Sequence, residues 1–331
     1  MRLAAYAQIR NEADIAAVFL RHLRALYDHV LLIDHGSSDG TSDVLIEACR
    51  VFPGWECWRC DIAGHHQGAF AKFAIDHLFA TTDASIVMIH DADEFLAVAD
   101  RDDLQQRLGV LDHPRTVGLL KWLNCVPGRF SPATDFDPAA GFWRPAHGSN
   151  VGKVVLSRRL MEETGGQAAP TMGNHDVEPM DGKPFEFRPV ADLLHFPIRS
   201  ASQISQKAAI GTIANLLRAD RLERDNFHWR DIVGRVADGS MDDADLIGLA
   251  ACYGMDDAIQ TPLGFDALPA QGFTWQHSGI ALADRFRTDK PGTLPDAWRI
   301  VCAALREPQQ AHRDALDLYV DSGRLLSRPA P

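Results

Sequence analysis

Several common signals are missing from this chain of 331 residues. No run approaches the roughly 18 apolar residues that a membrane-spanning helix needs, and the N-terminus turns polar at Gln8, without the apolar core of a secretory signal. We therefore expect a cytoplasmic protein without a transmembrane segment, and peripheral contact with a membrane stays open. A net charge of −12 without a basic run argues against a nucleic-acid partner.

Cysteine is scarce, and glycine is absent from the place where a nucleotide-binding turn would need it. Of the six cysteines only Cys57 and Cys60 form a C-x-x-C pair, and a zinc site would want a second pair, so we expect reduced thiols. The turn after the first expected strand has no G-x-G-x-x-G, and the chain has no P-loop. Backbone amides of that turn therefore do not cradle phosphate, and a phosphate-bearing ligand would need side chains and a metal.

The first hundred residues alternate between strand-like apolar runs and helical patterns. This alternation predicts an α/β fold with a central, mostly parallel, doubly wound sheet flanked by helices. The expected strands are Leu3–Ile9, His29–Asp34, Glu56–Cys60 and Ser85–His90, and the helices between them run near Ile15–Leu26, Ser42–Val51 and Ala69–Leu78.

Polar residues follow each of these four strands. In a doubly wound sheet, ligands bind beyond the carboxyl ends of the strands, so these residues predict one site at one edge. They are Arg10, Asn11 and Glu12 after the first strand, Asp34 and Asp39 after the second, His65, His66 and Gln67 after the third, and Asp91 and Asp93 after the fourth.

The fourth strand ends in an acidic cluster, Asp91, Asp93 and Glu94. Three carboxylates within four residues repel one another, so this turn is either well solvated or holds a cation. D-x-D recurs at residues 100–102, 135–137 and 243–245, but only this copy follows a buried strand pattern. A hard divalent cation would suit such oxygen ligands.

Beyond residue 100 the alternation fades, and we place a soft boundary near residue 200. Residues 1–200 would form the α/β domain and residues 201–331 a mainly helical C-terminal extension. Between two of the later strands, Asn124–Asn150 is either a functional loop or a structured surface excursion. Two later strands, antiparallel or mixed, are expected at Val117–Leu123 and Val151–Leu156, and one more at Ala191–Phe196. The later helices are expected at Gln203–Leu217, Asp243–Tyr253, Ala297–Leu305 and Ala311–Leu325.

Motifs in order along residues 1–211 point to a known family. They are Arg10-Asn11-Glu12, Leu23 and Leu26, the stretch from Ile33 to Thr41 (IDHGSSDGT), Asp91-Ala92-Asp93-Glu94-Phe95, and His195-Phe196-Pro197-Ile198-Arg199-Ser200 with Lys207 and Gly211. In these the chain resembles GT-A-fold glycosyltransferases of the family 2 type. Phe196 stands where the family more often has tyrosine, and the tail after about residue 220 matches nothing known to us.

The resemblance implies a glycosyltransferase of bacterial glycan or polysaccharide synthesis that depends on Mn²⁺ or Mg²⁺. Such an enzyme moves a sugar from a UDP- or GDP-linked donor to an acceptor hydroxyl, on a glycan or another molecule, with inversion. By resemblance, Asp34 and Asp39 would hold the base and ribose, flanked by Arg10, Asn11 and Glu12. Asp91 and Asp93 would bind the metal and diphosphate, with His195 as a further metal ligand.

Other residues are candidates for binding the donor. Lys153 and Arg199, with Lys207, could offset charge on the leaving diphosphate, and Gln67 and Lys72 are donor-binding candidates or helix-surface residues. Simpler roles also stay open: a helix cap for Asp34, a turn for Asp39 and a core position for His195.

An inverting enzyme also needs a carboxylate base for the acceptor hydroxyl. Asp176 is the first candidate, with Glu178 and Glu94 as rivals. Two other functions remain open. One is a non-catalytic carbohydrate- or nucleotide-binding protein with this fold. The other is a sugar-phosphate nucleotidyltransferase, against which the missing glycine-rich, Lys/Arg-containing loop argues.

Overall fold

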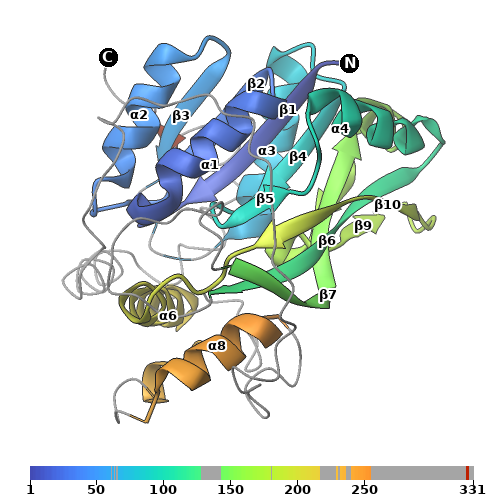
Figure 1. The fold of residues 1–331 in the computed structure, drawn as a ribbon. Helices are drawn as coiled ribbons and strands as arrows, with labels where there is room; N and C mark the ends of the chain where they lie inside the picture. The colour runs from blue at the N-terminus through green and yellow to red at the C-terminus, as the bar shows by residue number, and fades with distance from the viewer. Residues whose placement is uncertain are drawn as a thin grey trace.

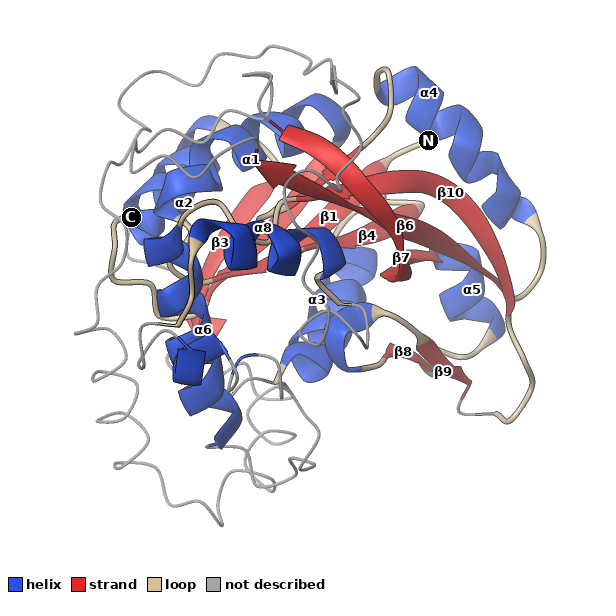
Figure 2. Ribbon diagram, turned by 60° about the horizontal axis from the view of Figure 1, so that its bottom comes forward, coloured by secondary structure: helices blue, strands red, loops and turns tan. Residues whose placement is uncertain are grey.

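The computed structural model describes residues 1–60, 62, 64, 66–127, 143–179, 181–216, 229, 232–235, 240–254 and 326–327. Within these residues a nine-stranded sheet carries helices on both faces, and a small β8–β9 hairpin lies beside it (Figures 1 and 2). The predicted α/β class, a large central sheet flanked by helices, is confirmed.

The first half of the sheet is parallel throughout. Its order is β3-β2-β1-β4, and each neighbouring pair runs parallel. The four expected strands are confirmed to within one residue at their starts, because their apolar runs are buried between the helical layers. The elements are β1 (Leu3–Ile9), α1 (Ala13–Leu26), β2 (His29–Asp34), α2 (Thr41–Val51), β3 (Trp55–Cys60), α3 (Gln67–Thr81) and β4 (Ile86–His90).

The second half of the sheet is mixed, as expected for the later strands. From β4 the order continues β7-β6-β10-β5, with β6 and β10 parallel and β7 antiparallel to its neighbours. β11 (Leu326–Ser327) adds an antiparallel edge to β3. The elements are β5 (Glu94–Leu96), α4 (Arg101–Leu108), η1 (Gly109–Asp112), β6 (Thr116–Pro127), β7 (Trp143–Ser157), α5 (Arg158–Glu163), β8 (Ala168–Pro170), η2 (Met172–Asn174), β9 (Val177–Pro179) and β10 (Glu186–His195).

The expectation of one long loop over Asn124–Asn150 was too broad. Asn124 to Pro127 continue β6, and residues 143–150 belong to β7, so the two strands pair well beyond their apolar centres. Residues 128–142 of that expected loop lie outside the described residues. Two short elements, β5 and α4, were not predicted.

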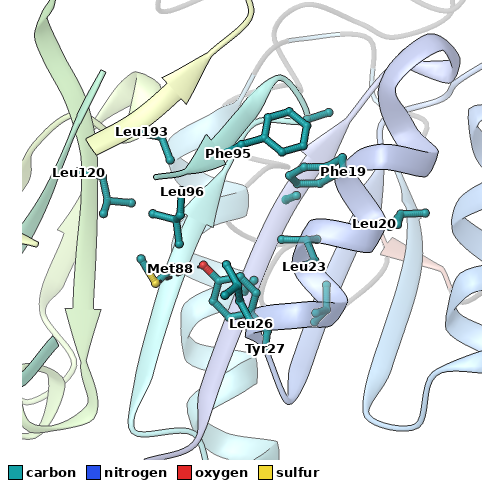
Figure 3. Close-up of a cluster of buried hydrophobic side chains, with 14 of the residues drawn as sticks. Phe19, Leu20, Leu23, Leu26, Tyr27, Met88, Phe95, Leu96, Leu120 and Leu193 are labelled. Carbon is teal, nitrogen blue, oxygen red and sulfur yellow. Dashed lines mark hydrogen bonds between the residues drawn. The ribbon is translucent and has the colours of Figure 1, made fainter. Parts of the chain in front are cut away.

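The sheet separates two apolar cores. Ala5 and Ala7 of β1 face α1, whereas Ala4 and Tyr6 face α3, because successive side chains of a strand point to opposite faces. Figure 3 shows the core on the α1 side. There α1, β4, β5, β6 and β10 contribute the labelled side chains Phe19, Leu20, Leu23, Leu26, Met88, Phe95, Leu96, Leu120 and Leu193, with Tyr27 directly after α1.

Two helices lie below the sheet in Figure 1, on the side where β1 and β4 end. They are α6 (Ala201–Leu216) and α8 (Asp243–Cys252), which confirms the helices expected there. A third apolar cluster joins them, with Val126 of β6 packed against Ile204 of α6 and Leu249 of α8. The helices expected at 297–305 and 311–325 lie outside the described residues, and the boundary near 200 stays a prediction.

Among the described helices, none is both long enough and apolar enough to cross a membrane.

Candidate functional site

Asp91 lies one residue beyond β4, at the carboxyl edge of the parallel strands. Its Oδ2 accepts a hydrogen bond from Lys153 Nζ at 2.7 Å, and its Oδ1 accepts one from Gln67 Nε2 at 3.2 Å. Burial favours the neutral acid, but the Lys153 ammonium outweighs it and holds the pKa of Asp91 below its ordinary value. Asp91 is therefore an ionised carboxylate, and 32% of its side chain is open to solvent.

Asp93 is almost completely buried and is surrounded by cationic and imidazole groups. Its Oδ2 accepts a hydrogen bond from Lys207 Nζ, and it lies 3.8 Å from Arg199 Nη1 and 3.9 Å from His195 Nε2. Burial alone would raise the pKa of Asp93, but Lys207, His195 and Arg199 together hold it well below its ordinary value. A second ionised carboxylate thus stands beside the first.

Arg199 connects the start of α6 to the start of α1. Its Nε donates to Asp14 Oδ2 at 2.6 Å and its Nη2 donates to Asp14 Oδ1 at 2.9 Å, a bidentate pair, and Nη2 also donates to Glu12. Lys207 Nζ lies 3.7 Å from Glu12 Oε1. Burial raises the pKa of Glu12 to about 7, against the pull of Arg199 and Lys207.

Glu94 is fully buried behind this cluster and is held from two sides. Its Oε1 accepts from Trp122 Nε1 at 2.7 Å, and its Oε2 accepts from the backbone nitrogen of Asp91 at 2.9 Å. Burial raises the pKa of Glu94 well above its ordinary value, despite Lys153 3.6 Å away. A base must reach the acceptor hydroxyl, so this enclosed side chain does not suit that role.

His195 ends β10 beside Asp93. Its ring stacks on Trp122, with centroids 4.2 Å apart, and its Nδ1 lies 2.9 Å from Asn124 Oδ1. Burial lowers the pKa of His195 to about 3, against the opposing effect of Asp93, so the imidazole is neutral at pH 7.

Asp34 and Asn11 join the turn after β2 to the turn after β1. Asp34 accepts from the backbone nitrogen of Ser37 at 2.9 Å and from Ser42 Oγ at 2.6 Å. Asn11 adopts a left-handed backbone, and its Oδ1 accepts from the nitrogen of Ser38 at 2.9 Å. These bonds explain why the stretch needs Asp, Ser and Asn at these spacings.

Asp39 links the same two turns at the start of α2. One oxygen accepts from the nitrogen and hydroxyl of Thr41 at 3.0 and 2.6 Å, and the other accepts from the nitrogen of Ala13 at 3.1 Å. Burial raises the pKa of Asp39 despite these bonds. Loop structure accounts for both Asp34 and Asp39, and their roles in holding base and ribose stay predictions.

The remaining donor candidates are placed differently from one another. Gln67 reaches Asp91, and the guanidinium of Arg10 lies over the Gly36 turn, 3.8 Å from where a Cβ on that glycine would stand. Lys72, by contrast, pairs with Asp76 one turn along α3. Among the described residues, no contact links Lys72 to the cluster around Asp91 and Asp93. The helix-surface alternative for Lys72 therefore fits its surroundings.

The two candidates for the base are exposed side chains on the segment that follows η2. Asp176 is exposed, and its Oδ1 accepts from the nitrogen of Val177 at 2.7 Å. Glu178 is exposed on β9, opposite Ala169 of β8. Two neighbours of Asp176 contact the cluster: the His175 ring meets Trp122 edge-on with centroids 5.1 Å apart, and the carbonyl of Gly173 accepts from Lys153 Nζ at 3.0 Å. A catalytic role for either carboxylate stays a prediction.

The donor set suits a hard divalent cation in part. Asp93 Oδ2 and His195 Nε2 face one another at 3.9 Å, and ligands of Mg²⁺ stand about 2.1 Å from the ion, so one ion fits between them. However, the described residues contain no group of three or more His, Cys, Asp or Glu side chains arranged to hold a metal ion. Lys207 and Lys153 occupy the two aspartates instead, so an ion would have to replace at least the Lys207 ammonium on Asp93.

Three residues of this site carry little signal in the sequence. Asp14 falls within the helical pattern of α1. Trp122 falls within an expected strand, and Asn124 stands at the start of the expected loop. A partial signal exists for Asn124, since this polar residue directly follows the expected strand Val117–Leu123. Their partners lie 28 or more positions away in the sequence, and only the fold brings them together.

Comparisons with known proteins add little to this picture. No family model and no curated protein matches the chain. Two similar solved structures are a crystal structure of S. aureus TarS 1–349, 12% identical over 78% of this chain and 77% of that chain, and one of S. aureus TarS, 9% identical over 77% of this chain and 44% of that chain. Both have a TM-score of 0.35.

Proposed function

We propose that this protein is a metal-dependent, inverting glycosyltransferase with a GT-A-type fold, which moves a sugar from a UDP- or GDP-linked donor to an acceptor hydroxyl. The observation that carries the proposal is the arrangement around Asp91 and Asp93. Two ionised carboxylates stand at the carboxyl edge of the parallel strands, with a neutral His195 and three cationic side chains around them. Ligands of doubly wound sheets bind at this edge.

The cationic groups suit a diphosphate leaving group. Lys153, Arg199 and Lys207 all lie within 4 Å of Asp91 or Asp93, so a diphosphate bound beside the aspartates would be within their reach. In the proposed reaction Lys207 exchanges its contact with Asp93 for one with a phosphate oxygen. A divalent ion held by Asp91, Asp93 and His195 would neutralise the negative charge that develops on the leaving diphosphate.

The acceptor side of the reaction rests on a carboxylate open to solvent. Asp176 is the proposed base, because it is exposed and lies three residues from the Gly173 carbonyl that Lys153 contacts. Glu178 is the alternative. Either carboxylate would take the proton of the acceptor hydroxyl as that oxygen attacks the sugar from the face opposite the diphosphate.

A thermal-shift panel of UDP- and GDP-sugars, with and without Mn²⁺, tests the proposal directly. A ligand that binds the native state raises its melting temperature, so at least one nucleotide sugar should do so in a Mn²⁺-dependent way. Asp93→Ala should abolish that shift and the release of nucleoside diphosphate. Asp102→Asn is the matched control, because Asp102 belongs to another D-x-D and is exposed on α4.

The outcomes separate this function from its alternatives. Full donor turnover by Asp93→Ala would contradict the proposal. Binding of a nucleotide sugar by the wild type without hydrolysis or transfer to any acceptor tested would favour a non-catalytic binding protein. Release of pyrophosphate from a nucleoside triphosphate and a sugar phosphate would identify a nucleotidyltransferase.

A further inference from the structure

Asn124 lies beside His195 because of the pairing of two strands. β6 and β10 run parallel, and their register places His195 opposite Asn124. The Asn124 side chain is fully buried, and its Nδ2 donates to two backbone carbonyls at the end of α8, Ala251 O at 3.2 Å and Tyr253 O at 2.8 Å. Carbonyl oxygens only accept hydrogen bonds, so the NH₂ group must face α8 and Oδ1 must face His195.

This orientation of the amide determines which nitrogen of His195 carries the proton. Asn124 Oδ1 lies 2.9 Å from His195 Nδ1 and can only accept, so Nδ1 must be the protonated nitrogen. In the neutral ring Nε2 then has a free lone pair. That nitrogen is the one that faces Asp93 Oδ2, at 3.9 Å.

The end of α8 also fixes the plane of the imidazole. The Tyr253 ring meets His195 edge-on, with centroids 5.3 Å apart, and Trp122 stacks on His195. Gly254 in turn packs against Trp122, because a Cβ at this glycine would stand 2.8 Å from the indole ring. The ring is therefore held by contacts that originate outside the parallel half of the sheet.

We propose that Asn124, held by the carbonyl end of α8, is a positioning residue that fixes His195 as the Nδ1–H tautomer and so presents Nε2 to a metal ion shared with Asp93. The metal part of this inference rests on the proposed function, whereas the tautomer does not. Groups that hold a metal-ligating histidine by its other nitrogen change metal affinity by about 10- to 100-fold when they are removed.

The test combines nuclear magnetic resonance and calorimetry on the full chain. With ¹⁵N-labelled histidine, the His195 signals are assigned by their loss in His195→Gln. We expect metal-free wild type to show a protonated Nδ1 and an unprotonated Nε2, and Asn124→Ala to lose this single tautomer. Titration with Mn²⁺ should give a Kd about 10- to 100-fold weaker for Asn124→Ala than for wild type.

Tyr27→Phe is the matched control. It deletes the hydrogen bond between the Tyr27 hydroxyl and His90 Nε2, another buried histidine contact, in the core on the α1 side. This variant should leave both the His195 tautomer and the Mn²⁺ affinity unchanged.

Each outcome tests either the positioning role of Asn124 or the metal site of the proposed function. A protonated Nε2 in metal-free wild type would overturn the positioning role without any variant, even if Asn124→Ala failed to fold. Unchanged tautomer and Mn²⁺ affinity in a folded Asn124→Ala would overturn it as well. A wild type with the expected tautomer that binds no Mn²⁺ would instead contradict the metal site of the proposed function and leave the positioning of His195 by Asn124 intact.

Discussion

The ammonium of Lys153 lies 2.7 Å from Asp91 Oδ2, and only 1% of the lysine side chain is exposed. Removing the lysine would leave Asp91 and the buried Glu94 without their common cation. Loss of one partner of a buried ion pair costs about 3–5 kcal/mol. We expect Lys153→Met to lower the free energy of unfolding by about that amount, as measured by urea denaturation.

Lys72→Met is the control for this prediction. Its pair with Asp76 is an exposed contact one helical turn apart, and such pairs contribute about 0.5 kcal/mol or less. Equal losses of unfolding free energy in the two lysine variants would show that the buried Lys153 pair contributes no more to stability than the exposed Lys72 pair.

Lys207→Met should change two affinities in opposite directions. Lys207 occupies the Asp93 carboxylate, so its removal frees a metal ligand, but it also removes a cation that could contact the diphosphate. We expect tighter Mn²⁺ binding without nucleotide and weaker binding of UDP or GDP in the presence of Mn²⁺, both by calorimetry. Weaker Mn²⁺ binding in the variant would contradict the exchange of Lys207 for a metal ion.

Glu12 should make stability fall as pH rises toward neutrality. Its pKa is raised from 4.5 to about 7 in the folded protein, mainly by burial. Below pH 4.5 the residue is protonated in both states, and its contribution is fully present. Between pH 4.5 and 7 the unfolded chain releases this proton first, so the contribution is lost, by up to about 3 kcal/mol.

Glu12→Gln isolates this effect, because Arg199 keeps its pair with Asp14 in the variant. Unfolding free energies of both proteins at pH 4.5 and pH 7.5 give a double difference in which the other titrating groups cancel. The stability of wild type relative to the variant should fall across this range. A constant difference would mean that folding does not shift the pKa of Glu12.

Asp34→Asn and Asp39→Asn should differ in stability. An Asn at 34 can still accept from the Ser37 nitrogen and donate to the Ser42 hydroxyl, so we expect a loss below about 1 kcal/mol. Asp39 accepts backbone N–H groups on both oxygens, so the NH₂ group of an Asn at this position would face a backbone N–H that also donates. We expect this substitution to lower the free energy of unfolding by about 1–3 kcal/mol.

The Asp34 variant also tests its predicted role toward the base. A folded Asp34→Asn protein that binds UDP and GDP as tightly as wild type would reduce Asp34 to a structural residue. Thermal denaturation and nucleotide titration of the same samples provide both measurements.

The sequence predicted the strands that position this site better than the contacts between its side chains. Apolar runs such as His29–Asp34 identify buried strands because burial on both faces demands apolar residues, and the strand ends then locate Asp91. The short strand β5 and helix α4 were missed because a few residues carry too little periodicity to be distinguished from a loop.

Contacts between distant segments could not be predicted in the same way. Lys207 reaches Asp93 across 114 positions and Asn124 reaches His195 across 71. Each contact depends on how α6 docks or on the register of β6 with β10, and composition and spacing do not encode either feature locally. The hydrogen bond from the Ala13 nitrogen to Asp39 could not be predicted for the same reason, because Ala13 begins α1, 26 positions away.

The docking of α8 bears on how this protein should be divided for experiments. The sequence motifs of the site end near residue 211, yet the carbonyl groups that orient Asn124 belong to Ala251 and Tyr253. A fragment ending at α6 would retain Asp91, Asp93 and His195 but expose the Asn124 amide to water and free the imidazole to exchange tautomers. The shortest fragment that carries the complete site therefore extends at least to Gly254.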